Sequence, residues 1–207
     1  MRLAALLCAA AVVMSCGGTA TAVKTAAPVF TPPPSPPVST PTATPAAARS
    51  GAPTPAFSCL IHSFPEPATK ATVVLANGGQ FTITLRPDKA PATVKNFADL
   101  SRSKCYDNLK FHRVVPGFVI QGGDPLGNGS GGGNQPTELS DLPFVKGAVG
   151  IARAGDIKVS NAFQFFVCIG ECRSLDNMYT NFGTVTEGQA VADAVKVGDA
   201  IKTITIQ

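Results

Sequence analysis

One arginine and two glutamines stand among large apolar residues, where polar side chains could do chemistry. Arg113 and Gln121 lie in the stretch FHRVVPGFVIQGGDP at 111–125, and Gln164 begins the stretch QFFV at 164–167. Alternate side chains of a strand share a face, so these stretches can present Arg113, Gln121 and Gln164 beside aromatic rings. The alternative is a polar cluster that only caps the edge of a sheet, and the spacing does not distinguish the two.

Short strands must position these residues. The pair Pro116-Gly117 predicts a tight turn that folds the two halves of 111–122 back on each other. The pair Asn77-Gly78 predicts a second hairpin, because this dipeptide favours a two-residue turn. Further strands are expected at 147–152, 163–169, 182–186 and 200–206, and helices are expected after Asp88 and at 190–197. Many short strands with two brief helices predict a mainly β fold, a closed antiparallel barrel capped by α-helices.

The loop at 126–135 contains the spacing GxGxxG through Gly127, Gly129 and Gly132. A dinucleotide site requires that this pattern open a helix within a βαβ unit. The residues that follow have no helical periodicity, so a flexible loop that lines a groove is the better interpretation.

Histidine and cysteine give no pattern of metal ligands. Only His62 and His112 are present, and neither has a partner at a spacing typical of zinc, so we expect no metal. His112 is expected to be an ordinary hydrogen-bonded histidine in a strand. The cysteines beyond the N-terminal region allow three disulfide pairings, which the sequence leaves open, and a buried free thiol is the alternative for one of them: Cys59, Cys105, Cys168 and Cys172.

The N-terminal region differs in composition from the rest. Residues 1–15 carry one charge and an apolar run too short to span a membrane, which is typical of a secretory signal. The sequence VVMSCGG resembles the lipobox of bacterial lipoproteins and predicts a lipid on Cys16, although a cleaved signal with a chance cysteine is the alternative. Residues 16–56 are rich in Pro, Thr and Ala and predict a disordered linker. We therefore expect an extracytoplasmic domain at 57–207, anchored to the cell membrane.

The charge of this predicted domain is nearly balanced. The chain has 17 Lys and Arg against 13 Asp and Glu, and Arg2, Lys24 and Arg49 lie before it, whereas every Asp and Glu lies within it. No basic run points to nucleic acid, and none is expected as a partner.

The motifs together resemble one family. The stretch at 111–125, followed in order by GNGSGGG, GIARAG, QFFV, LDN and FGTVTEG, is similar to the cyclophilin family of peptidyl-prolyl cis-trans isomerases from about Thr72 to Ile206. The resemblance implies an eight-stranded antiparallel barrel capped by two α-helices. It implies catalytic roles for Arg113, Phe118 and Gln121. It also implies substrate-binding roles for Val119, Gly129, Ala152, Arg153, Gln164, Phe166, Leu175 and Tyr179.

The resemblance implies rotation of X-Pro bonds in proline-containing peptides and unfolded exported proteins, by a monomer without a cofactor. The alternative is a peptide-binding or holdase module with little turnover on the same scaffold. Ser174 stands where many members carry an aromatic residue, Arg153 replaces an asparagine, and Phe163 replaces a small polar residue. These departures could change the peptide preference, whereas Arg113, Gln121 and the implied ring pocket are retained.

Overall fold

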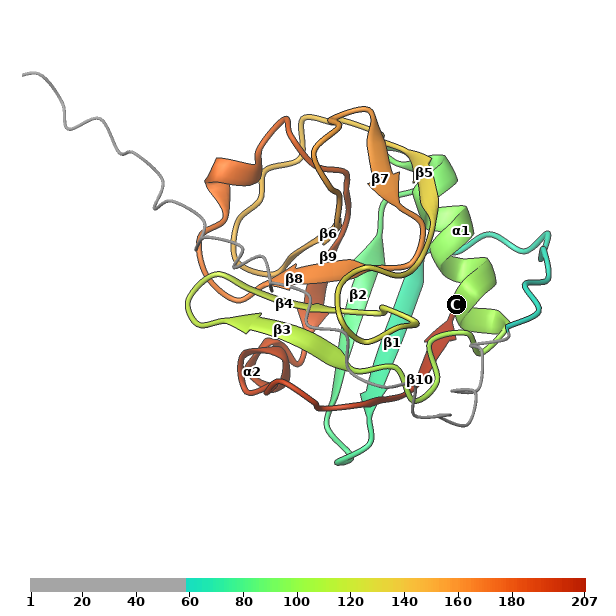
Figure 1. Ribbon diagram of the computed structural model, residues 1–207, viewed down its shortest axis with the longest axis vertical. Helices are drawn as coiled ribbons and strands as arrows, with labels where there is room; N and C mark the ends of the chain where they lie inside the picture. The colour runs from blue at the N-terminus through green and yellow to red at the C-terminus, as the bar shows by residue number, and fades with distance from the viewer. Residues whose placement is uncertain (1–58) are drawn as a thin grey trace, which may run out of the picture. The chain divides into compact units, whose positions relative to one another are not determined.

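The computed structural model describes residues 59–207, and most of the strands in this part of the chain form one sheet (Figure 1). Its eight strands are β1 (Lys70–Leu75), β2 (Gln80–Leu85), β3 (Phe111–Val115), β4 (Val119–Gly122), β6 (Ala148–Ile151), β8 (Phe165–Cys168), β9 (Asn181–Glu187) and β10 (Ile201–Ile206). Neighbouring strands are antiparallel, in the order β10-β1-β2-β9-β6-β8-β4-β3. The predicted mainly β fold is therefore confirmed.

The prediction of a closed barrel is wrong, because the sheet is curled but its strand pairing does not run full circle. The edge strands β3 and β10 form no ladder with each other, and an isolated bridge between Lys110 and Ala200 lies just before each strand. Hydrogen bonds from Asn108 N–H to Ile201 O and from Gly198 N–H to Phe111 O lie next to this bridge, at 2.8 and 2.9 Å. Asn108 and Gly198 take positive φ angles of 66° and 95°, so regular strand geometry does not continue through them. The curl still brings both edges of the sheet together around one core.

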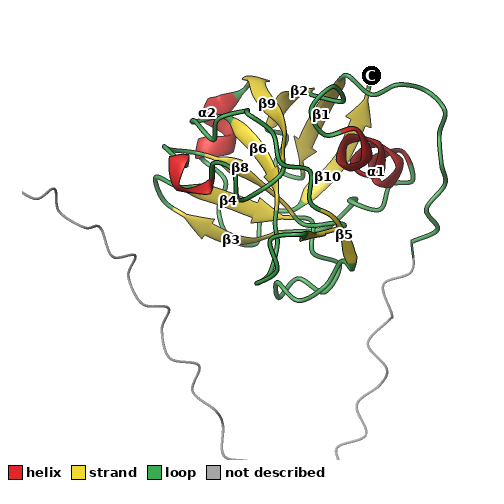
Figure 2. Cartoon of the chain, turned by 90° about the horizontal axis from the view of Figure 1, so that it is seen from above, coloured by secondary structure: helices red, strands yellow, loops and turns green. Residues whose placement is uncertain are grey.

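Two α-helices lie on opposite sides of the curled sheet (Figures 1 and 2). They are α1 (Pro91–Arg102) and α2 (Gln189–Asp193), and a short 3-10 helix, η1 (Arg173–Leu175), precedes β9. The apolar side chains of α1 are buried, and the Phe97 ring lies 5.1–5.5 Å from the rings of Tyr106, Phe165 and Phe182. This aromatic cluster fixes α1 against the sheet, and contacts between aromatic rings add to the stabilisation from burial of apolar area.

Two elements differ from the sequence prediction for local reasons. The strand expected at 163–169 begins only at Phe165, because Asn161 Oδ1 accepts the backbone N–H groups of Phe163 and Gln164, both at 2.8 Å. A small second sheet, which the sequence did not predict, pairs β5 (Asn134–Pro136) with β7 (Val159–Asn161). It therefore ties the end of the glycine-rich loop to the segment before β8.

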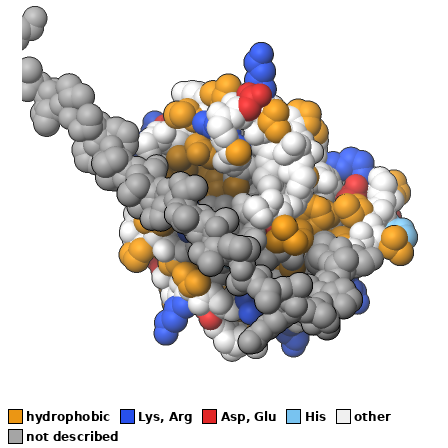
Figure 3. Space-filling view, in the orientation of Figure 1, with side chains coloured by type: hydrophobic (Ala, Val, Ile, Leu, Met, Phe, Trp, Pro, Cys, Tyr) orange, Lys and Arg blue, Asp and Glu red, His pale blue; other side chains and the backbone are white. Residues whose placement is uncertain are grey.

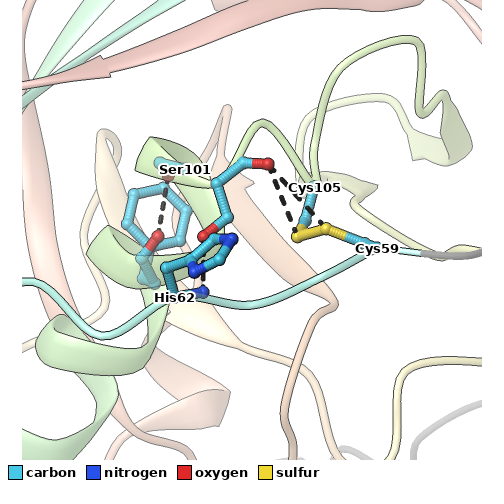
Figure 4. Close-up of a disulfide and its surroundings, with 6 residues drawn as sticks. Cys59, His62, Ser101 and Cys105 are labelled. Atoms are coloured by element: carbon cyan, nitrogen blue, oxygen red, sulfur yellow. Dashed lines mark hydrogen bonds between the residues drawn. A yellow bond between two sulfur atoms is a disulfide. The ribbon is translucent and has the colours of Figure 1, made fainter.

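The structure pairs Cys59 with Cys105 and leaves Cys168 and Cys172 as buried free thiols (Figure 4). The disulfide ties the segment before β1 to the turn that follows α1, and His62 N–H donates to Ser103 Oγ at 2.9 Å beside it. This assigns the pairing that the sequence left open.

The predicted signal peptide at 1–15, the lipidation site Cys16 and the linker at 16–56 lie outside the described residues. Within 59–207, no helix has the length and apolar character needed to cross a membrane.

On the face drawn in Figure 3, hydrophobic side chains line the floor of a hollow in the surface.

Candidate active site

Arg113, Gln121 and Gln164 form a continuous row of hydrogen bonds across the sheet. Arg113 on β3 is directly opposite Gln121 on β4, and Arg113 Nη1 donates to Gln121 Oε1 at 3.3 Å. Gln121 Nε2 in turn donates to Gln164 Oε1 at 2.9 Å. Each amide both accepts and donates a hydrogen bond, so donation runs in one direction along the row. It begins at the exposed guanidinium of Arg113 and proceeds to Gln164.

A bulge in β3 produces this alignment. Phe111 pairs with Gly122 and Arg113 with Gln121, so His112 is the extra residue on its strand. A bulge re-aims the side chains that follow it. Arg113 therefore points along the same face as Gln121, which strict alternation along the stretch at 111–115 would not have specified.

Gln164 is the buried end of the row, with only 2% of its surface exposed. Its Nε2 donates to the carbonyl oxygens of Gly129 and Gly131, at 3.0 and 2.8 Å. Both oxygens belong to the glycine-rich loop, which therefore lines a groove as the sequence predicted. A buried amide whose donors and acceptor are all used is held in one orientation.

Asp124 holds this loop, and the sequence analysis missed it. The carboxylate is 1% exposed and accepts the backbone N–H groups of Leu126 at 3.0 Å, Asn128 at 2.9 Å and Gly129. Hydrogen bonds to an ionised acceptor are stronger than those between neutral groups. An aspartate directly before a glycine-rich loop is a signal that could have identified it, since such a side chain can bond to the backbone two residues on.

His112 does not behave as the sequence predicted. Both ring nitrogens are buried and neither has a hydrogen-bond partner in the described part of the chain. Burial lowers the pKa of His112, and Arg113 lowers it further, whereas the nearby Asp124 opposes the shift. Neither ring nitrogen therefore forms the expected hydrogen bond within residues 59–207, and the ring lies beside Gly129 of the loop.

A cavity of about 290 Å³ lies beside Arg113, and its lining combines apolar and aromatic side chains with polar ones. Its lining consists of Arg113, Phe118, Val119, Gln121, Ala152, Arg153, Phe166, Leu175 and Tyr179. The Phe166 ring stacks on Phe144 with centroids 5.6 Å apart and meets the Tyr179 ring edge-on at 5.8 Å, so it cannot turn freely. The result is a site in which rigid aromatic side chains lie next to the cationic side chains of Arg113 and Arg153.

A second cavity of about 380 Å³ continues from the first along the glycine-rich loop. The two share Gln121, Ala152 and Arg153, and the second is otherwise lined by Gly129, Ser130, Gly133, Asn134, Ala154, Asn161 and Gln164. Every catalytic and substrate-binding residue predicted from the sequence lines one of these two cavities. Ser174 lines neither and is exposed on η1, and Phe163 packs instead near Tyr106, with ring centroids 6.2 Å apart.

Comparison with known proteins agrees with this arrangement. The family model for cyclophilin type peptidyl-prolyl cis-trans isomerases matches residues 71–206. The chain belongs to the cyclophilin family. It is therefore a peptidyl-prolyl cis-trans isomerase, and the match covers all the strands of the large sheet from Ala71 onward.

Similar cyclophilins come from distant organisms. The chain is 38% identical over 138 residues to peptidyl-prolyl cis-trans isomerase B of Bacillus subtilis, covering 65% of this chain and 95% of that protein. It is 39% identical over 142 residues to isomerase CYP57 of Arabidopsis thaliana, covering 65% of this chain but only 28% of that longer relative.

A solved structure shares the fold. The crystal structure of a Cryptosporidium parvum cyclophilin type isomerase in the presence of the dipeptide ala-pro matches with a TM-score of 0.60 and 28% identity. The match covers 67% of this chain and 98% of that chain.

Proposed function

We propose that this cyclophilin accelerates X-Pro rotation in exported proteins, using Arg113 as its catalytic group, while a lipid on Cys16 ties it to the cell membrane. The observation that carries the catalytic part is the row from Gln164 through Gln121 to Arg113, the last two of which line the cavity beside Phe118, Val119 and Phe166. The reaction has two requirements, of which the cavity meets the first and the row of hydrogen bonds meets the second.

The first requirement is to hold the proline ring. The cavity beside Arg113 takes the apolar pyrrolidine ring against Phe118, Val119 and Phe166, with Leu175 and Tyr179 closing its side. Burial of apolar surface stabilises this arrangement by roughly 25 cal/mol per Å² removed from water. Gln121 and Ala152, which border both cavities, hold the peptide chain on either side of the ring.

The second requirement is to favour the twisted amide over both planar forms. Resonance makes the C–N bond partly double, which gives a barrier of about 18–20 kcal/mol. In the twisted transition state this resonance is lost, and the prolyl nitrogen regains a basic lone pair. A guanidinium N–H directed at that nitrogen binds the twisted form more strongly than either planar isomer, and only such differential binding accelerates a reaction.

Gln121 directs the arginine. Because its Oε1 accepts from Arg113 Nη1, it holds one edge of the guanidinium and leaves the remaining N–H groups for the substrate. Gln164 and the two carbonyl groups of the loop fix Gln121 in turn. Prepositioned donors of this kind need no reorganisation during the reaction.

Two features support export. The apolar run and Cys16 at the start of the chain form a lipobox-like sequence, and a Pro-rich stretch follows it. The Cys59–Cys105 disulfide also supports an oxidising compartment, since disulfides persist outside the cytosol and are rare within it. The substrates would then be unfolded exported proteins, whose X-Pro bonds isomerise slowly without a catalyst.

Two measurements test the proposal. The protein should accelerate cis-trans isomerisation of a short Ala-Pro peptide in a protease-coupled assay, and no acceleration would overturn the catalytic part. In cells, the wild-type protein should fractionate with membranes and carry a lipidated Cys16 by mass spectrometry, whereas Cys16→Ser should be released or left unprocessed. A soluble, unmodified wild-type chain would contradict the membrane anchor without affecting the catalytic part.

A further inference from the structure

Arg153 lines both cavities, and hydrogen bonds to backbone carbonyl groups hold its guanidinium in place. Arg153 Nε donates to Met178 O at 2.8 Å, and Nη1 donates to Ala154 O and Gly155 O at 3.0 and 3.2 Å. The group also lies 4.6 Å from the centre of the Tyr179 ring. These contacts fix its orientation, yet the carbonyl groups and the ring carry no net charge, so the full positive charge remains.

One nitrogen of this guanidinium, Nη2, is free to bind a ligand. Arg153 Nη2 has no hydrogen bond to any residue in 59–207, and the side chain is only partly buried. Nε and Nη1 are already used, so Nη2 can donate to one oxygen of a carboxylate in a charge-assisted hydrogen bond.

The groove around Arg153 contains positive charge and no compensating carboxylate. Neither cavity has an Asp or Glu in its lining, whereas Arg113 and Arg153 both line the first. Neither arginine has an ion-pair partner in the part of the chain that the structure describes. The carboxylate nearest in sequence, Asp156, accepts the N–H of Lys158 and lines neither cavity.

We infer that Arg153 makes this isomerase prefer peptides that carry an acidic side chain within a few residues of the proline. The inference rests on the proposed function, because it assumes that the proline ring occupies the first cavity. The peptide chain then continues past Arg153 into the second cavity, and an extended chain advances about 3.3 Å per residue, so a side chain one to three residues from the proline passes the guanidinium. A carboxylate there accepts from Arg153 Nη2, whereas a lysine is repelled by two cations.

The effect is moderate because the groove is open to water. Exposed ion pairs change an equilibrium by about two- to fivefold, and salt weakens them. The preference therefore modulates selection among X-Pro sites and does not replace recognition of the proline ring.

Matched peptides test the inference. Two series should be compared, with Glu, Gln or Lys placed either two residues before the proline or two residues after it. In one of the series, kcat/KM of the full chain should fall in the order Glu, Gln, Lys, with about a two- to fivefold ratio of Glu to Gln at low salt. The ratio should shrink towards one at about 0.5 M NaCl, where the screening length is only a few Å.

Variants assign the preference to this residue. Arg153→Gln should bring the Glu-to-Gln ratio close to one, and Arg153→Lys should retain most of it. Using a ratio removes any general loss of activity or folding. Arg86→Gln is the matched control, because Arg86 pairs with Asp88 and lines neither cavity, so its ratio should equal that of the wild type.

The outcomes separate the two proposals. Equal turnover of the Glu, Gln and Lys peptides in both series, or a ratio that persists in Arg153→Gln, overturns this inference and leaves the proposed function intact. No turnover of the neutral Gln peptide would overturn the proposed function and this inference with it.

Discussion

Replacing Asp124 with asparagine should weaken the attachment of the glycine-rich loop, although Asp124 itself lines neither cavity. The carboxylate accepts three backbone N–H groups of the glycine-rich loop, one at Oδ1 and two at Oδ2. Asparagine keeps one oxygen but presents an NH₂ group to the remaining N–H donors, so at least one bond is lost and two donors face each other. A hydrogen bond to a charged group contributes about 1.5–3 kcal/mol, so we expect Asp124→Asn to lower the free energy of unfolding by about 2–4 kcal/mol.

Asp124→Asn should also disturb the row of hydrogen bonds formed by Gln164, Gln121 and Arg113. Gly129 O and Gly131 O accept from Gln164, and Gln164 orients Gln121, which holds Arg113. A loop that moves leaves this row less ordered, so we expect kcat/KM to fall about tenfold, equivalent to about 1.4 kcal/mol of transition-state stabilisation. Urea denaturation followed by circular dichroism gives the stability, and the protease-coupled assay gives kcat/KM well below the unfolding transition.

Asp199→Asn is the control for this prediction. Asp199 accepts a single backbone N–H, that of Lys196, in an exposed hydrogen bond, and it lines neither cavity. Its replacement should change the free energy of unfolding by less than about 1 kcal/mol. Wild-type stability together with wild-type kcat/KM in Asp124→Asn would refute the view that this carboxylate holds the loop and, through it, the catalytic arginine.

Two further predictions concern the frame of the site. Reduction of the Cys59–Cys105 disulfide should lower the free energy of unfolding by up to about 4 kcal/mol, because the bridge closes a loop with a sequence separation of 46; coinciding urea curves with and without reductant would contradict this. Gly150→Ala should raise KM and lower the free energy of unfolding by about 1–3 kcal/mol, because a Cβ there would collide with the Phe166 ring and lie 2.7 Å from Phe144. Gly155→Ala has no atom within 4 Å of its new Cβ and serves as the control, so a wild-type KM in Gly150→Ala would show that the ring does not need its present position.

The sequence predicted the site better than it predicted the sheet. The turn at Pro116-Gly117 and strand alternation were enough to predict that Arg113, Gln121 and Gln164 could lie near one another, but the bulge at His112 that aligns Arg113 with Gln121 was not predicted. The prediction that the barrel is closed was wrong, because closure depends on whether two edges far apart in sequence form a ladder. Here the two edges meet at an isolated bridge next to Asn108 and Gly198, whose positive φ angles interrupt strand geometry, and the sequence alone did not reveal this.

The supporting residues were missed for a related reason. Asp124 and Asn161 act on backbone N–H groups of the loop and of the segment before β8, and their importance appears only once the loop has a conformation. The pairing of Cys59 with Cys105 likewise depends on where the chain before β1 runs past the end of α1. His112 was expected to have a hydrogen-bond partner, but the bulge at this residue turns its ring beneath the loop.

The most direct test of the account separates catalysis from binding at Arg113. The guanidinium is proposed to act on the twisted amide, and the apolar side chains of the cavity are proposed to bind the ring. Arg113→Ala should therefore lower kcat/KM by roughly 100-fold or more, about 3 kcal/mol. Arg113→Lys should recover only part of this loss, since an ammonium lacks the fork that Gln121 orients. The Kd for an unreactive proline peptide, measured by titration on the same variants, should change less than about fivefold, as expected for a contact made mainly in the transition state. Equal losses in kcat/KM and in binding would mean that Arg113 only holds the substrate, and the proposed mechanism would be wrong.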